Sequence, residues 1–263
     1  MTQPRIILIG GGNMGGAMAL RWHAANAGSV AVVERDASRR AYFAAQGIAC
    51  VETLADTSRG DIYVLAIKPQ QFDAFRPELV STKIPLLVSI MAGVTLAQLH
   101  GVCAQAVRVM PNLPASIGES MSVLCALALA DETRGKLDAL FSAIGSTAWV
   151  ADEQQLHAVT AISGSGPAYV FAFMEALEKA AIAQGLSAAL AKQLVAQTFR
   201  GAALLAAQSP LDVSELRAQV TSKGGTTHAA LEALSAGDFE ALIVAAVQAA
   251  SARSKALAAS SDR

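Results

Sequence analysis

The chain has 263 residues, of which 53% are hydrophobic and 16% are charged, and its formal net charge at pH 7 is −1. This length suits two modest domains or one large one, and the composition can bury a sizeable core. Because there is no basic run, nucleic acid and anionic membranes are disfavoured as partners. Because few residues are charged, we expect apolar surface to be hidden in a subunit interface.

The three cysteines, Cys50, Cys103 and Cys125, are scattered along the chain without a metal-site spacing. Their odd number, with no signal-peptide pattern, predicts a reducing, cytoplasmic location and no bound metal. No apolar run reaches the length of a membrane span, so we expect no membrane association.

The first predicted element carries the strongest motif. Residues Ile6 to Met18 read IILIGGGNMGGAM, in which four apolar residues predict a buried strand and a helix-compatible run follows. Gly10, Gly12 and Gly15 fit G-x-G-x-x-G, in which the glycines permit a tight turn, a close approach to a pyrophosphate and helix-on-strand packing. This context favours a dinucleotide site over an ordinary glycine-rich turn.

Five further strands are predicted in the first half of the chain, with helical stretches between most of them. This β–α–β rhythm is typical of a parallel, doubly wound sheet. The expected strands are Ser29–Glu34, Ala49–Val51, Asp61–Ile67, Leu86–Ile90 and Ala106–Met110.

From Gln154 onward the strand signals vanish and helical spacing takes over. We therefore predict a Rossmann-like NAD(P)-binding domain over residues 1–151 and an all-helical domain over residues 152–263. The expected helices are Pro167–Gln184, Ala188–Gln208, Val213–Val220, Thr227–Leu234 and Phe239–Ala258.

The end of the second strand bears on the choice of cofactor. Glu34 stands where an acid would bind the ribose 2′-hydroxyl of NAD. Arg35 follows at once, and an arginine there can bind the 2′-phosphate of NADP. We favour NADPH and keep NADH as the alternative. Arg39 and Arg40 are expected to lie on a solvated helix face.

Later strand ends add candidate cofactor contacts, because ligands of open α/β sheets lie beyond the carboxyl ends of the strands. Lys68 is either a cofactor contact or a surface lysine before a helix-starting proline. Asn112 offers an amide to the nicotinamide side, or is an ordinary turn residue. The candidates are Ala66, Ile67, Lys68 and Pro69, then Met91, Ala92 and Gly93, and Asn112.

Two polar, glycine-rich islands interrupt the helical half, one at Ile162–Tyr169 and one at Val220–Thr227. Each leads into a helix, so backbone N–H groups and hydroxyls can receive a carboxylate. Simple helix capping by Thr226 or Thr227 is the alternative.

Taken together, these motifs resemble the pyrroline-5-carboxylate reductase family over nearly the whole chain. The most specific pieces are SGSGPAY and SKGGTT, supported by IGGGNMGGAM, LAIKPQ, SIMAGVT and RVMPNLPA. The resemblance implies NAD(P)H-dependent reduction of the cyclic imine 1-pyrroline-5-carboxylate to L-proline, the final step of proline synthesis. It also implies a homodimer of interlocked C-terminal helices, often assembled further into a decamer.

The family's functional positions fall on three parts of this chain. Substrate contacts map to Glu153, just before the AVT run, and to Gly225, Thr226 and Thr227. Thr227 is the catalytic candidate because its hydroxyl can hydrogen-bond to the imine nitrogen. The nucleotide contacts map to Ile9, Gly10, Gly12, Asn13, Met14 and Gly15, and the nicotinamide contacts to Ala66–Pro69 and Met91–Gly93.

Three departures from the family pattern stand out. Lys223 occupies a common proline position, which adds a positive charge to the substrate loop. Leu113 replaces a common threonine. Met91 replaces a small residue, so its side chain is expected to crowd the cofactor pocket.

The four histidines match no triad or metal pattern. His157 follows Glu153 by four residues, which predicts an ion pair on a helix. Two other interpretations stay open: a related imine or β-hydroxyacid reductase, and a nucleotide-binding protein without catalysis. The related imine and β-hydroxyacid reductases typically use a lysine on the long helix as a general acid. Here the long helix, Pro167–Gln184, has Lys179 near its end and no lysine at its start, which counts against these reductases.

Overall fold

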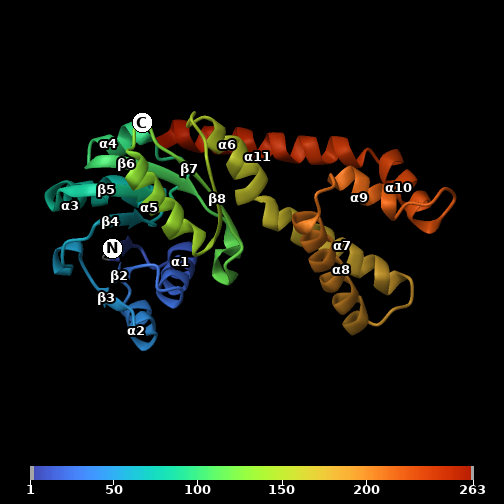
Figure 1. Cartoon of the computed structure of the whole chain (residues 1–263), viewed down its shortest axis with the longest axis horizontal. Helices are drawn as coiled ribbons and strands as arrows, with labels where there is room; N and C mark the ends of the chain where they lie inside the picture. The colour runs from blue at the N-terminus through green and yellow to red at the C-terminus, as the bar shows by residue number, and fades with distance from the viewer. Residues whose placement is uncertain (1–2, 262–263) are drawn as a thin grey trace. The chain divides into compact units, whose positions relative to one another are not determined.

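The computed structural model describes residues 3–261, with side chains to residue 259. The chain forms two compact units, one of residues up to Ser165 together with those from Ala249 onward, and one of Gly166–Gln248 (Figure 1). The border predicted after residue 151 follows the last strand, whereas the contacts divide the chain after Ser165. None of the described helices is long and apolar enough to cross a membrane.

An eight-stranded sheet organises the first unit, in the order β3-β2-β1-β4-β5-β6-β7-β8. Its central strands are continuous apolar runs, which suits strands that are covered on both faces. The strands are β1 (Arg5–Ile9), β2 (Ser29–Val33), β3 (Ala49–Val51), β4 (Ile62–Leu65), β5 (Ile84–Ser89), β6 (Cys103–Met110), β7 (Ser120–Cys125) and β8 (Gly145–Trp149).

The predicted parallel, doubly wound sheet is confirmed for the six predicted strands, β1 to β6, and the sheet turns antiparallel only where the unpredicted β7 joins it. β6 and β7 pair antiparallel, with Met110 opposite Val123. The connection from β6 to β7 contains only the short turn η3 (Leu113–Ile117). It is too short for parallel pairing, because parallel neighbours need a crossover connection of about a dozen residues or more. Neither β7 nor β8 was predicted, because their small and polar residues give no clear strand signal.

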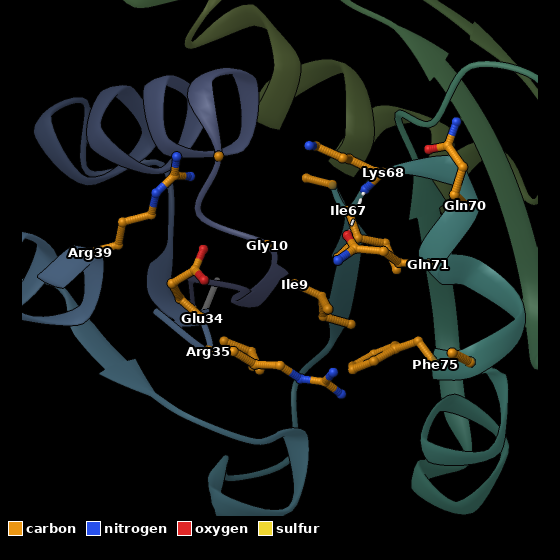
Figure 2. Close-up of a pocket in the computed structure, with 14 residues that line it drawn as sticks. Ile9, Gly10, Glu34, Arg35, Arg39, Ile67, Lys68, Gln70, Gln71 and Phe75 are labelled. Atoms are coloured by element: carbon orange, nitrogen blue, oxygen red, sulfur yellow. Dashed lines mark hydrogen bonds between the residues drawn. The ribbon is translucent and has the colours of Figure 1, made fainter. Parts of the chain in front are cut away.

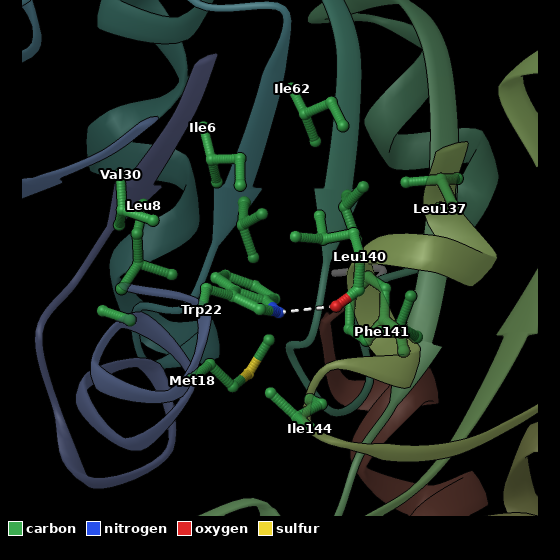
Figure 3. Close-up of a cluster of buried hydrophobic side chains, with 14 of the residues drawn as sticks. Ile6, Leu8, Met18, Trp22, Val30, Ile62, Leu137, Leu140, Phe141 and Ile144 are labelled. Atoms are coloured by element: carbon green, nitrogen blue, oxygen red, sulfur yellow. Dashed lines mark hydrogen bonds between the residues drawn. The ribbon is translucent and has the colours of Figure 1, made fainter. Parts of the chain in front are cut away.

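Helices cover both faces of the sheet. Trp22 of α1 packs edge-on against Phe141 of α5, and its indole N–H donates to the Leu140 carbonyl at 2.8 Å (Figure 3). This contact ties the two helices across one apolar core. That face carries α1 (Asn13–Ala24), α2 (Ala37–Ala45) and α5 (Asp131–Ser142), and the other carries α3 (Phe72–Thr82), α4 (Leu96–His100) and α6 (Gln155–Val159).

Short turns complete the first unit. The first two, η1 (Leu54–Asp56) and η2 (Pro69–Gln71), flank β4, and the π-helical turn η4 (Thr160–Gly164) follows α6. Of these turns, η2 places polar residues directly after the carboxyl end of β4.

The second unit is entirely helical, and all five predicted helices are confirmed with small shifts at their ends. Among the described residues of this unit, only Ala191 and Val195 are buried hydrophobics, while Phe171 and Leu205 are more than half exposed. The unit therefore lacks a core of its own. Its helices are α7 (Gly166–Ala183), α8 (Ala188–Gln208), α9 (Val213–Gln219), α10 (Thr226–Ala236) and the first part of α11 (Phe239–Ser261).

Candidate active site

The glycine turn between β1 and α1 lies tightly against the end of β4. Gly10 has φ +99°, and a Cβ there would lie 2.8 Å from the Ala66 carbonyl oxygen. A Cβ on Gly15 would overlap the Gly10 carbonyl oxygen. Gly12 precedes α1 without a side-chain cap, so the first amides of the helix remain available to an anion.

A cavity of about 460 Å³ opens beyond the carboxyl ends of β1, β2 and β4 (Figure 2). Eight of the predicted cofactor residues line it: Ile9, Gly10, Gly12, Glu34, Arg35, Ala66, Ile67 and Lys68. The sequence reasoning missed Gln70, Gln71, Ala74 and Phe75, which follow the predicted Lys68–Pro69 corner. A helix signal directly after that corner could have placed them on the cavity wall.

Glu34 is held by the backbone of the site. Its Oε2 accepts the Gly11 N–H at 2.9 Å and its Oε1 accepts the Asp36 N–H at 3.0 Å. The carboxylate therefore fixes the glycine turn against the end of β2.

Arg35 extends along the cavity toward α3. Its guanidinium lies 5.5 Å from the centroid of the Phe75 ring, and its side chain is 73% exposed. In Figure 2 Arg35 points to Phe75, away from Glu34. Stacking on an aromatic face leaves the N–H donors of an arginine free for a phosphate.

The expected solvated helix face is confirmed for Arg39, which is exposed on α2, and is wrong for Arg40, whose side chain is 24% exposed. Arg39 is exposed but lines the cavity, and its Nη1 donates to the Gly11 carbonyl at 3.2 Å. Arg40 donates to the carbonyls of Glu34 and Arg35 and pairs with Glu52 at 3.1 Å. Arg39 thus adds a second positive charge to the wall, whereas Arg40 braces the turn.

Several other predicted cofactor residues do not line this cavity. Asn13 lines a neighbouring hollow beside the glycine turn, while Met14 packs partly buried against the core. Pro69 begins η2, and Ala92 precedes Gly93, whose φ is +80°.

Met91 is 3% exposed within the hydrophobic core, so the expectation that its side chain crowds the pocket is wrong. Gly93 lies against the end of α11, since a Cβ on it would approach the Leu257 backbone to 3.3 Å. The buried Met91 side chain and the close contact of Gly93 with α11 both hold the loop after β5 in place.

Asn112 is occupied by the fold. Its Nδ2 donates to the Ser163 carbonyl at 3.0 Å, and its Oδ1 accepts the Met121 N–H at 2.9 Å. It therefore joins the end of β6 to β7 and to the polar island before α7. This favours the structural interpretation of Asn112.

Glu153 makes an ion pair with Arg108, and its Oε1 also accepts the Leu96 N–H. The predicted ion pair between Glu153 and His157 is wrong, because α6 begins only at Gln155 and Glu153 turns to β6. The buried His157 instead contacts the Ser254 Oγ through Nδ1 at 2.9 Å. Burial and the neighbouring Arg108 and Lys255 lower the pKa of His157.

The substrate loop predicted from the sequence belongs to the second unit. The N-cap residue of α10 is Gly225, so no side chain caps the start of this helix. Thr226 and Thr227 are its first two residues. Capping by either threonine, the alternative to ligand binding, is therefore wrong. Thr226 is exposed and Thr227 is half-buried. The start of α10 offers open N–H groups and hydroxyls to a carboxylate.

The fold and this cavity define a class of protein: an NADP-type oxidoreductase with a doubly wound nucleotide domain. The family model for NADP oxidoreductase, coenzyme F420-dependent, matches residues 5–93, and the model for pyrroline-5-carboxylate reductase dimerisation matches residues 153–257. The chain is 40% identical to pyrroline-5-carboxylate reductase of Pseudomonas aeruginosa over 98% of both chains. It belongs to the pyrroline-5-carboxylate reductase family.

Solved structures agree with this assignment. The pyrroline-5-carboxylate reductase of Coxiella burnetii superposes with a TM-score of 0.90 at 32% identity, covering 97% of this chain and 99% of the other. The pyrroline carboxylate reductase of Plasmodium falciparum, solved with NADP bound, gives 0.83 at 29% identity, covering 98% and 99%.

Proposed function

We propose that this protein reduces 1-pyrroline-5-carboxylate to L-proline with NAD(P)H, with NADPH preferred, as the last step of proline synthesis. The observation that carries the proposal is the cavity beyond the glycine turn, with Arg35 and Arg39 on its wall. The full-length likeness to reductases named for this imine supplies the substrate.

The residues present fit NADPH. The turn at Gly10 and Gly15 leaves a cradle that any Cβ would fill, and the uncapped start of α1 suits a pyrophosphate. Arg35 and Arg39 suit a 2′-phosphate. When bound, the nicotinamide supplies the hydride that reduces the imine carbon.

The chain's own groups then position the substrate. We assign the imine carboxylate to the open N–H groups of Thr226 and Thr227 at the start of α10. Gly225 precedes them as the N-cap, and its own N–H donates to the Ser222 carbonyl at 3.0 Å. The Thr227 hydroxyl donates a hydrogen bond to the imine nitrogen, and Lys223 adds positive charge to the loop. That bond is made to the neutral imine. When the imine is instead protonated in water before it binds, its N–H donates to the Thr227 hydroxyl oxygen, and in neither case is a strong base needed.

The working form is proposed to be a homodimer joined through the helical unit, with further assembly into a decamer. The exposed apolar side chains of α7, α8 and α11 support this arrangement. The match to a dimerisation family supports oligomerisation independently. A cytoplasmic location is proposed with it, supported by the free thiols of Cys50, Cys103 and Cys125.

An assay of NADPH oxidation with pyrroline-5-carboxylate tests the function. We expect turnover with NADPH and slower turnover with NADH. A panel of five- and six-membered cyclic imines, run beside it, tests the substrate. Absence of turnover with either cofactor would leave a nucleotide-binding protein, and faster turnover of a six-membered imine would replace the proposed substrate.

A further inference from the structure

Glu78 of α3 holds a negative charge beside the cavity arginine. Its Oε1 accepts the Leu54 N–H at 2.8 Å, which fixes the carboxylate. Its Oε2 then lies 3.7 Å from the Nη2 of Arg35, and its side chain is 29% exposed. The acid is therefore anchored by one oxygen and faces the arginine with the other.

Glu78 is not needed to orient Arg35. The 3.7 Å separation exceeds hydrogen-bonding distance, and ion pairs of such exposed groups contribute little. The Phe75 ring, one turn earlier on α3, already packs against the guanidinium, with its centroid 5.5 Å away. The main effect of Glu78 at this place is its negative charge.

We propose that Glu78 sets the discrimination between NADPH and NADH, by opposing the 2′-phosphate at Arg35. The inference rests on the proposed function, in which Arg35 receives that phosphate. A phosphate seated on the guanidinium is repelled by the fixed carboxylate, whereas the ribose hydroxyl of NADH carries no charge to repel. Glu34 differs from Glu78 in its partners, since backbone N–H groups bind both of its oxygens, whereas Oε2 of Glu78 faces the Arg35 guanidinium.

Binding of cofactor fragments tests the proposal without catalysis. The probes are adenosine 2′,5′-bisphosphate, which carries the 2′-phosphate, and AMP, which lacks it. The variant is Glu78→Gln, because its amide oxygen can keep the bond to Leu54 N–H. We expect it to bind the bisphosphate about three- to tenfold more tightly at low salt, and AMP within about twofold of wild type.

Two matched variants complete the experiment. Glu132→Gln removes a carboxylate from another exposed ion pair, with Lys136 on α5, and should change neither affinity. In the Arg35→Ala background, Glu78→Gln should lose most of its effect, because the phosphate no longer sits beside the acid.

The outcomes separate the two proposals. If Arg35→Ala weakens the bisphosphate selectively but Glu78→Gln leaves it unchanged or weakens it, the role of Glu78 is overturned alone. Equal tightening of AMP, or an equal effect of Glu132→Gln, also overturns it, since the effect would then be net charge. If Arg35→Ala has no selective effect, the proposed phosphate contact itself fails.

Discussion

Arg108 in β6 donates a hydrogen bond from its buried guanidinium to Oε1 of Glu153, at 2.7 Å. The same oxygen accepts the Leu96 N–H at the start of α4, also at 2.7 Å. One carboxylate oxygen thus joins β6, α4 and the segment before α6. Within the described part of the chain, the second oxygen has no hydrogen-bond partner, so a substrate contact by Glu153 stays a prediction.

Removal of Glu153 should destabilise the fold. Glu153→Ala leaves the Arg108 charge buried without a partner, and we expect the free energy of unfolding to fall by about 3–5 kcal/mol. Glu153→Gln keeps an acceptor and should lose less. Urea unfolding measures both. Unchanged stability with a large loss of kcat/KM would instead assign Glu153 to the substrate.

Arg35 should distinguish the cofactors. Arg35→Ala removes a charge-assisted contact to the 2′-phosphate, worth about 1.5–3 kcal/mol, and should raise KM for NADPH by about one to two decades. KM for NADH should change little. Arg59→Ala, at an exposed arginine outside the cavity, is the control. Equal effects on both cofactors would show that Arg35 does not read the phosphate.

Thr227 should act through its hydroxyl. Thr227→Val keeps the shape but removes the donor, and kcat/KM for the imine should fall about ten- to a hundredfold, the scale of a hydrogen bond to a charged group. Thr227→Ser should keep most activity, and NADPH affinity should stay constant in both. A Val variant with near wild-type kcat/KM would leave the backbone N–H groups of α10 as the main substrate contact.

His157 should make stability depend on pH. Burial, followed by the charges of Arg108 and Lys255, lowers its pKa below the ordinary 6.5. Below that pH His157 binds a proton in the unfolded chain but stays neutral in the folded chain. The contribution of His157 to the free energy of unfolding is therefore fully present above about pH 6.5 and is lost as the pH falls.

Urea unfolding of wild type and His157→Gln at several pH values measures this contribution. The wild-type slope below about pH 6.5 should include up to about 1.4 kcal/mol per pH unit that His157→Gln lacks. His23→Gln, at an exposed histidine, should keep the slope. Parallel profiles for wild type and His157→Gln would contradict the assignment.

The helical unit should associate. Light scattering at micromolar concentration should give at least twice the 27.0 kDa chain mass, with an interface of well over roughly 2,000 Å². Leu205→Glu, at a 56% exposed position of α8, should weaken the dimer, whereas Val80→Glu, 50% exposed on α3, should not. A 27.0 kDa species for wild type would refute the dimer.

The local pattern of the chain was enough to predict the nucleotide turn and the helical half. Gly10 and Gly15 must be glycine because of contacts with their near neighbours in the turn and with Ala66, at the next strand end. The helices from Gly166 to Ser261 follow a period of 3.6 residues that a single segment displays. The family resemblance gave the assignment, now confirmed by the full-length relatives.

Tertiary structure alone decided how the polar side chains are used. Phe75 and Arg39 reach the cavity from separate helices. The Asn112 amide makes its hydrogen bonds with the backbone of Met121 and Ser163. Glu153 turned to Arg108, 45 residues earlier, rather than to the histidine one turn ahead. A polar side chain can form hydrogen bonds with many different partners, and the local sequence does not show which one it uses. Only the packing of distant segments brings one of these partners within about 3 Å.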